Sequence, residues 1–268
     1  MYDAGAGTEF SGDIVGNIRR LADVESRELG NRRDLFVYLP PSYATSGRHY
    51  PVIYMQDGQN LFDAALSFAG AWHVDDTMEA LAREGLEAIV VGIPNMGAER
   101  ADEYAPFRDE RCGGGRADAY LAFVAGTVKP LVDARFRTRR EPAHTGIMGS
   151  SMGGLVSLYA LLTRPATFGF AGVMSPSLWF ADGAIFRVAE AAGRWDGRLY
   201  LDTGTGEGRP HVRQVREMVR LLRRQAPHPR RQLRYVEDRG AGHNEAAWGA
   251  RFERAIRWLL PPRRDLNW

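Results

Sequence analysis

A serine with a glycine two residues to either side is the residue of this sequence with the clearest chemistry. The run GSSMG at 149–153 fits the pattern G-x-S-x-G, with Ser151 at its centre. An apolar run precedes it and a helix-compatible run follows, which is the strand–turn–helix setting in which a serine hydroxyl projects from a sheet as a nucleophile. We therefore expect Ser151 to be a catalytic nucleophile. The alternative interpretation is an unreactive serine in a glycine-rich turn.

A serine nucleophile requires a base that takes its proton and an acid that orients the base. Of the six histidines, His243 lies in the glycine-rich segment RGAGHN at 239–244, between the last expected strand and the last expected helix. The chain order serine, acid, histidine is the order found in hydrolases that are built around this serine turn. His243 is therefore the expected base, and the alternative is a hydrogen-bonded loop histidine without a catalytic role.

The acid is expected in the segment DTGTGEG at 202–208, which follows an apolar run. Two carboxylates compete there, because Asp202 ends the expected strand whereas Glu207 lies in the loop beyond it, within reach of His243. We favour Glu207 over Asp202, and Asp238 is a third candidate. The acid would accept the Nδ1–H of the imidazole, which fixes the tautomer of the base and stabilises its protonated form.

The negative charge that develops on the attacked carbonyl oxygen requires two hydrogen-bond donors. One is expected to be the backbone N–H of Met152, directly after the nucleophile. The second is expected from the segment QDGQNLFD at 56–63, where Gly58 lets the backbone turn and leaves the N–H of Gln59 as the donor. Asp-Gly is also a common turn pair, and this structural role is compatible with donation by the backbone.

These residues follow short apolar runs that alternate with helical patterns along the chain. The expected strands cover residues 18–24, 35–39, 52–55, 88–93, 145–148, 169–174, 199–202 and 233–236. The expected helices cover residues 74–83, 117–136, 152–162, 212–225 and 245–260. Several strands are apolar throughout, as strands buried on both faces are. The pattern predicts an α/β fold with a mostly parallel central sheet and helices on both faces, in which ligands bind at the carboxyl ends of the strands.

Composition excludes several other classes of protein. The chain has 268 residues, a formal net charge of +2 and 44% hydrophobic residues, so no bulk charge directs it to nucleic acid or to an anionic membrane. The longest strongly apolar run, 88–93, is far shorter than a membrane-spanning helix. Cys112 is the only cysteine, which excludes an intramolecular disulfide and a multi-cysteine zinc site. The arginine-rich helix at 212–225 is interpreted as a solvated helix face.

The sequence also suggests how the chain is organised. Residues 1–17 are expected to be an N-terminal extension, 18–260 a single catalytic domain and 261–268 a C-terminal tail. The first ten residues lack the basic start and apolar centre of a signal peptide, so a cytoplasmic location is expected. Whether the chain forms a homo-oligomer is left open.

Four segments together resemble one known family. They are YLPPSY at 38–43, YMQDGQNLFD at 54–63, GSSMGGL at 149–155 and GHNEAAW at 242–248. They are similar to segments of the putative-esterase family of α/β-hydrolases, which includes feruloyl and acetylxylan esterases, siderophore trilactone esterases and S-formylglutathione hydrolases. The resemblance runs from about residue 18 to residue 260. It implies an α/β-hydrolase fold and a serine esterase that works without a cofactor or a catalytic metal.

The resemblance also implies the roles of individual residues. Ser151 would be the nucleophile, His243 the base, and the amides of Gln59 and Met152 the donors to the oxyanion. The family's acid falls where Glu207 stands, although aspartate is common at that position.

The substrate is expected to be a small-molecule carboxylic ester with a short-chain or an aryl acyl group of the feruloyl or acetyl type. Trp179, Tyr104 and Arg108 are candidates for contacts with it, because they lie in loops that should face the strand ends. One alternative is a siderophore trilactone of the enterobactin type. Another is a non-catalytic protein that keeps the fold and binds a ligand.

Overall fold

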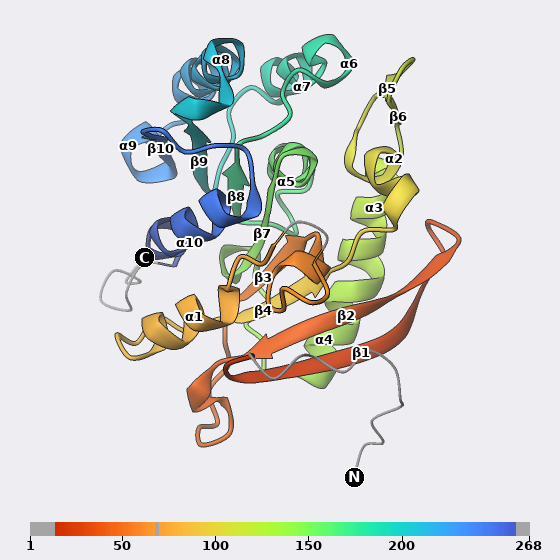
Figure 1. Ribbon diagram of the computed structural model, residues 1–268, viewed down its shortest axis with the longest axis vertical. Coiled ribbons are helices and arrows are strands. Elements are labelled where there is room, and N and C mark those ends of the chain that lie inside the picture. The colour runs from red at the N-terminus through yellow and green to blue at the C-terminus, as the bar shows by residue number, and fades with distance from the viewer. Residues whose placement is uncertain (1–13, 68–69, 261–268) are drawn as a thin grey trace.

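An eight-stranded sheet forms the centre of the computed structural model, which describes residues 14–67 and 70–260 (Figure 1). Its strands are, in chain order, β1 (Asn17–Ser26), β2 (Asn31–Leu39), β3 (Val52–Gln56), β4 (Ile89–Ile93), β7 (Thr145–Ser150), β8 (Phe170–Met174), β9 (Arg198–Gly204) and β10 (Leu233–Asp238). The spatial order is β1-β2-β4-β3-β7-β8-β9-β10. β1 and β2 form an antiparallel hairpin that pairs antiparallel with β4, and the remaining strands are parallel. The carboxyl ends of those parallel strands therefore meet at one edge of the sheet.

The central strands are apolar on both faces because both faces are covered. In β3, Val52 and Tyr54 pack into one hydrophobic cluster, whereas Ile53 and Met55 pack into a second cluster on the opposite face. Alternate residues of a strand point to opposite faces, so a continuous apolar run is what a strand between two helical layers requires.

Helices supply both layers. They are α1 (Val74–Ala82), α2 (Arg100–Tyr104), α3 (Ala117–Phe123), α4 (Lys129–Arg135), α5 (Met152–Thr163), α6 (Phe180–Gly183), α7 (Ile185–Ala192), α8 (Arg209–Gln225), α9 (Pro229–Gln232) and α10 (Glu245–Leu259). The apolar residues of α1 and α10 belong to one cluster, and those of α3, α4, α5, α7 and α8 belong to the other. Figure 1 shows the sheet between these two groups of helices.

The predicted fold class is confirmed, and all eight expected strands are present with shifted ends. The expected helix at 117–136 is interrupted by one π-helical stretch, Val124–Val128, between α3 and α4. The sequence did not predict the short hairpin of β5 (Arg108–Asp109) and β6 (Gly113–Gly114), nor α2, α6, α7 and α9.

Most of the expected N-terminal extension, residues 1–13, and the expected tail, 261–268, lie outside the described residues. The proposed domain boundaries therefore stay predictions. Within the described ranges, no helix combines the length and the apolar character that crossing a membrane requires.

Candidate active site

Ser151 occupies the sharp junction between β7 and α5, with φ 55° and ψ −119°. Positive φ is rare for residues other than glycine and marks a strained turn. The backbone amide of Ser151 donates to the carbonyl of Met174 on the neighbouring strand β8, at 3.0 Å. A Cβ on Gly149 would lie 2.9 Å from the backbone of Gly153, so this turn needs glycine there. The surrounding packing therefore holds Ser151 at the carboxyl end of β7.

His243 lies between Ser151 and Glu207 and uses a different ring nitrogen toward each. Its Nε2 is 2.9 Å from Oγ of Ser151, and its Nδ1 is 2.8 Å from Oε2 of Glu207. The imidazole is 40% exposed, whereas the Glu207 side chain is buried. The ring of Trp248, in the first turns of α10, meets the imidazole edge to face with 4.9 Å between centroids. The structure thus brings together the serine, the histidine and the favoured acid.

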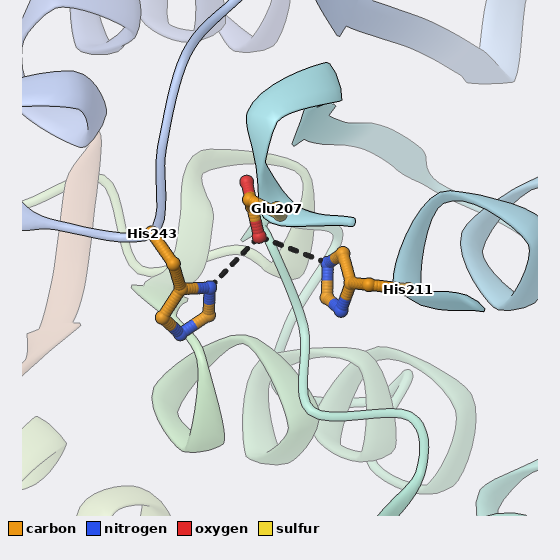
Figure 2. Close-up of side chains that lie close together, drawn as sticks. All are labelled: Glu207, His211 and His243. Carbon is orange, nitrogen blue, oxygen red and sulfur yellow. Dashed lines mark hydrogen bonds and ion pairs between the residues drawn. The ribbon is translucent and has the colours of Figure 1, made fainter. Parts of the chain in front are cut away.

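Glu207 ends a short 3₁₀ turn, Thr205–Glu207, that directly follows β9. Its Oε1 accepts hydrogen bonds from the hydroxyl of Ser175 at 2.5 Å and from the backbone amide of Gly204 at 2.6 Å. Its Oε2 faces His243 and also His211 on α8, as Figure 2 shows. Burial by itself raises the pKa of Glu207, but the two imidazoles and the two donors to Oε1 outweigh burial and hold the pKa well below its usual range.

Asp202 has a different partner. Its Oδ2 accepts from Nε of Arg251 on α10 at 3.0 Å, and both side chains are buried. A second guanidinium nitrogen of Arg251 donates to the hydroxyl of Ser175 at 2.9 Å. Burial raises the pKa of Asp202 to about 6 against the opposing effect of Arg251. Among the described residues, neither Asp202 nor Asp238 makes a recorded contact with His243, so Glu207 is the carboxylate that the structure brings to the imidazole.

The turn that contains Gln59 follows β3, next to the strand that ends in Ser151. Asp57 begins this turn with φ 54° and is held by Arg100, whose Nε and Nη2 donate to its two oxygens at 2.7 and 2.8 Å. A Cβ on Gly58 would lie 2.5 Å from the backbone of Gly92 on β4, so the turn packs directly on the sheet. The position of the Gln59 amide is therefore fixed by the backbone of its neighbours.

Met152 is the first residue of α5, and the first amides of a helix have no acceptor within the helix. The same holds for Gln59 in its short 3₁₀ turn, Gly58–Asn60. The side chain of Gln59 accepts a hydrogen bond from the amide of Asn95 at 3.2 Å. The amides of Gln59 and Met152, which the sequence analysis predicts as donors to the oxyanion, thus lie just beyond the carboxyl ends of the adjacent strands β3 and β7.

The three expected substrate contacts lie in different surroundings. Trp179 is 50% exposed and packs on Phe180, after β8. Tyr104 is fully buried, and its hydroxyl accepts from the amide of Asp57 at 3.1 Å. Tyr104 therefore supports the turn of Gln59 from behind, which differs from the expectation that it lines the site. Arg108 is exposed on the β5–β6 hairpin and has no recorded contact with Ser151, His243 or Glu207 in the described part of the chain.

Sequence reasoning missed several side chains around this site. Ser177 donates its amide to the carbonyl of Ser151 at 3.0 Å, and the two hydroxyl oxygens are 3.2 Å apart. Ser175, His211 and Arg251 surround the carboxylate of Glu207. The sequence contains one indication that Arg251 is buried, because Arg251 falls on the apolar stripe of α10 with Trp248 and Phe252. A charged residue on a buried stripe needs a partner in the core.

Comparisons with known proteins extend this picture. The family described as "Putative esterase" matches residues 26–259. An uncharacterized protein of Bacillus subtilis (strain 168), YbbA, is 28% identical over 90% of this chain and 98% of its own length. A siderophore triacetylfusarinine C esterase of Aspergillus fumigatus is 35% identical over 53% of this chain, which spans only 49% of that protein. The crystal structure of an IroE-like serine hydrolase from Shewanella oneidensis superposes with a TM-score of 0.75 at 21% identity, over 91% of this chain and 80% of that one.

The strand order, the strained serine turn after β7 and this structural likeness define an α/β-hydrolase. Within that class the chain belongs to the Putative esterase family, because the match covers nearly the whole chain. The protein is therefore a carboxylic-ester hydrolase of the serine type. The expected family and enzyme class are confirmed.

The buried pair of Arg251 and Asp202 predicts a large effect on stability. Arg251→Met leaves Asp202 buried without a partner, so we expect the free energy of unfolding in urea to fall by about 3–5 kcal/mol. Arg257→Met is the matched control on the same helix, since Arg257 pairs with Glu84 at the surface, and its loss should stay below about 1 kcal/mol. Equal losses of unfolding free energy in Arg251→Met and Arg257→Met would show that the buried pair of Arg251 and Asp202 is no more important for stability than the surface pair.

Proposed function

We propose that Ser151, His243 and Glu207 form the catalytic triad of this esterase. Oγ of Ser151 attacks the ester carbonyl carbon while Nε2 of His243 accepts the hydroxyl proton. The tetrahedral intermediate collapses, the C–O bond to the alcohol breaks, and His243 returns the proton to the leaving alcohol. A water molecule then attacks the acyl-enzyme by the same route and releases the carboxylic acid. The amides of Gln59 and Met152 stabilise the oxyanion of both intermediates.

One observation carries this proposal, namely that His243 contacts both other members of the triad through the appropriate nitrogens. The carboxylate at 2.8 Å from Nδ1 favours a proton on that nitrogen, which leaves the lone pair of Nε2 for the hydroxyl of Ser151 at 2.9 Å. The pKa of Glu207 lies well below its usual range, so the carboxylate stays ionised at neutral pH. An ionised Glu207 supports the imidazolium that forms when Ser151 attacks.

Substitution of the nucleophile tests the proposal directly. We expect the wild-type protein to hydrolyse p-nitrophenyl acetate and to react with a fluorophosphonate probe. Ser151→Ala should lose the reaction with the probe and lose hydrolysis by a factor of 10³ or more, on the order of what triad removal costs elsewhere. Ser150→Ala is the matched control, because Ser150 is the neighbouring serine at the end of β7, and it should keep the label. Labelling that persists in Ser151→Ala would place the nucleophile elsewhere.

Replacing each candidate acid by its amide tests the role of Glu207. In Glu207→Gln the amide oxygen would stay with its two donors, Ser175 and Gly204, and the NH2 group would face Nδ1 of His243, which favours the wrong tautomer, so kcat should fall by roughly 10³-fold or more. Asp202→Asn disturbs the pair with Arg251, so its main effect should be on the urea midpoint, with a smaller loss of kcat. A greater loss of kcat in Asp202→Asn, measured on folded protein, would reverse the assignment.

For the substrate we propose a carboxylic ester with an aryl acyl group. The exposed indole of Trp179 supports this choice, because it lies two residues after Ser177, whose hydroxyl is 3.2 Å from Oγ of Ser151. An aromatic acyl group on Ser151 would find a stacking surface near the nucleophile.

Trp179→Ala should therefore raise KM for methyl ferulate about three- to tenfold, which corresponds to the usual energy of one aromatic contact. The KM for an acetyl ester should change little, which makes acetate the internal control. An equal change in KM for both esters would contradict the aryl preference.

The second candidate substrate is a siderophore ester. It is favoured by the identity of 35% to the siderophore triacetylfusarinine C esterase of Aspergillus fumigatus over about half of this chain. Comparing kcat/KM for a siderophore trilactone with that for methyl ferulate separates the two candidates. A cytoplasmic location remains a prediction from the sequence.

A further inference from the structure

The carboxylate of Glu207 has a second imidazole neighbour that the reaction does not use. His211 lies in the first turn of α8, and its Nε2 is 3.1 Å from the same Oε2 that faces Nδ1 of His243 (Figure 2). The two imidazole rings meet edge to face with 5.9 Å between centroids. Two histidines thus converge on one carboxylate oxygen.

Nε2 of His211 is not satisfied by this arrangement. The atom is buried and makes no hydrogen bond of acceptable geometry with any described residue, although the oxygen is close. A buried polar atom without a partner carries a free-energy cost. The ligating atoms of Glu207, His211 and His243 all lie within 4.8 Å of one another. Together they offer two nitrogen ligands and one oxygen ligand within that span.

We propose that these three residues form a binding site for Zn²⁺ that inhibits the enzyme. Two histidines and one carboxylate, with a fourth position left to water, are an established set of ligands for zinc. Tetrahedral coordination with bonds of about 2.0–2.1 Å separates neighbouring ligand atoms by about 3.3–3.4 Å. The two nitrogens lie 2.8 and 3.1 Å from Oε2 of Glu207 and would move slightly outward, while the two nitrogens themselves, within 4.8 Å of each other, would approach to the same spacing.

The surroundings suit such a site. Oε1 of Glu207 accepts hydrogen bonds from Ser175 and from the amide of Gly204. These bonds hold the carboxylate in place and leave Oε2 for a metal ion. The imidazole of His243 is 40% exposed and follows the glycine-containing segment 239–242, which gives a metal ion access from solvent. The charge of Arg251 lies on the side of Oε1, 3.8 Å away, and is shared with Asp202.

The predicted effect on catalysis follows from the tautomer of His243. Zinc on Nδ1 leaves the only proton of the neutral imidazole on Nε2, which then donates to Oγ of Ser151 and has no lone pair to accept its proton. The ion also takes the carboxylate away from the imidazole. Bound zinc would therefore stop the reaction with only small movements of Glu207, His211 and His243. This inhibition rests on the proposed function, whereas zinc binding itself does not.

The binding test uses tag-free protein and ZnCl₂ in isothermal titration calorimetry. We expect one zinc ion per chain, and at least roughly tenfold weaker binding in His211→Gln, since loss of even an outer partner of a metal site costs that much. His73→Gln is the matched control, because it removes a histidine that faces Asp76 at 3.5 Å on the surface. Cys112→Ser controls for zinc on the exposed thiol. Both controls should bind zinc as the wild type does.

The inhibition test compares each variant with its own zinc-free rate of p-nitrophenyl acetate hydrolysis. Zinc should abolish the wild-type rate, EDTA should restore it, and His211→Gln should need at least roughly tenfold more zinc for the same loss. Ser151→Ala separates the two proposals, because it should bind zinc with unchanged affinity whether or not the wild type hydrolyses the ester.

Two results of the calorimetry would overturn the zinc site. One is equal zinc affinity in His211→Gln and the wild type, and the other is loss of binding in His73→Gln or Cys112→Ser. Should His211→Gln fail to fold, anomalous scattering from a zinc-soaked wild-type crystal decides the matter, with a peak expected between Glu207, His211 and His243. A zinc peak elsewhere and none between these residues would also overturn it.

Discussion

The hydrogen bond between Nδ1 of His243 and Oε2 of Glu207 joins two loops that also meet through their backbones, where the amide of Gly206 donates to the carbonyl of Ala241 at 3.0 Å. One loop follows β9 and the other follows β10, and the two strands run parallel, so their ends lie side by side at the edge of the sheet. The bond fixes which nitrogen of the imidazole carries the proton, and through it the state of Ser151. The fold contributes by bringing three separate segments to one edge of the sheet.

Glu207 can serve this bond because its other oxygen, Oε1, already has two donors. Ser175 and Gly204 occupy Oε1, and Arg251 holds Ser175 while it pairs with Asp202. The arrangement places two buried carboxylates near one buried guanidinium, with one carboxylate stabilised as an anion by hydrogen bonds and the other paired with the charge. A buried network of this kind is costly when incomplete, so each member constrains the position of the next. It connects α10, β8, β9 and the turn after β9 in one polar layer beneath the triad.

The sequence predicted those parts of the site that depend on local pattern. The serine turn can be recognised because its glycines and the strand and helix that flank it are contiguous in the sequence. His243 can be recognised because few histidines follow one of the last expected strands. The choice between Glu207 and Asp202 depended on which side chain reaches across to the next loop, which the two positions, five residues apart, do not reveal. Tyr104 was expected at the surface of the site, but the fold buries it beneath Asp57. The roles of His211 and Arg251 depend on contacts between distant segments, which periodicity does not encode.

The loop that carries His243 follows β10, the last strand of the sheet. Within the described residues β10 pairs with β9 alone, and most of its side chains are partly exposed, whereas Ser151 follows β7 in the middle of the sheet. Segments at such an edge open at a lower free energy than the core does. Release of β10 would carry His243 away from Ser151 and would withdraw Leu233 alone among the buried members of the two hydrophobic clusters. Enzymatic turnover would therefore report on the fraying of one edge of this protein.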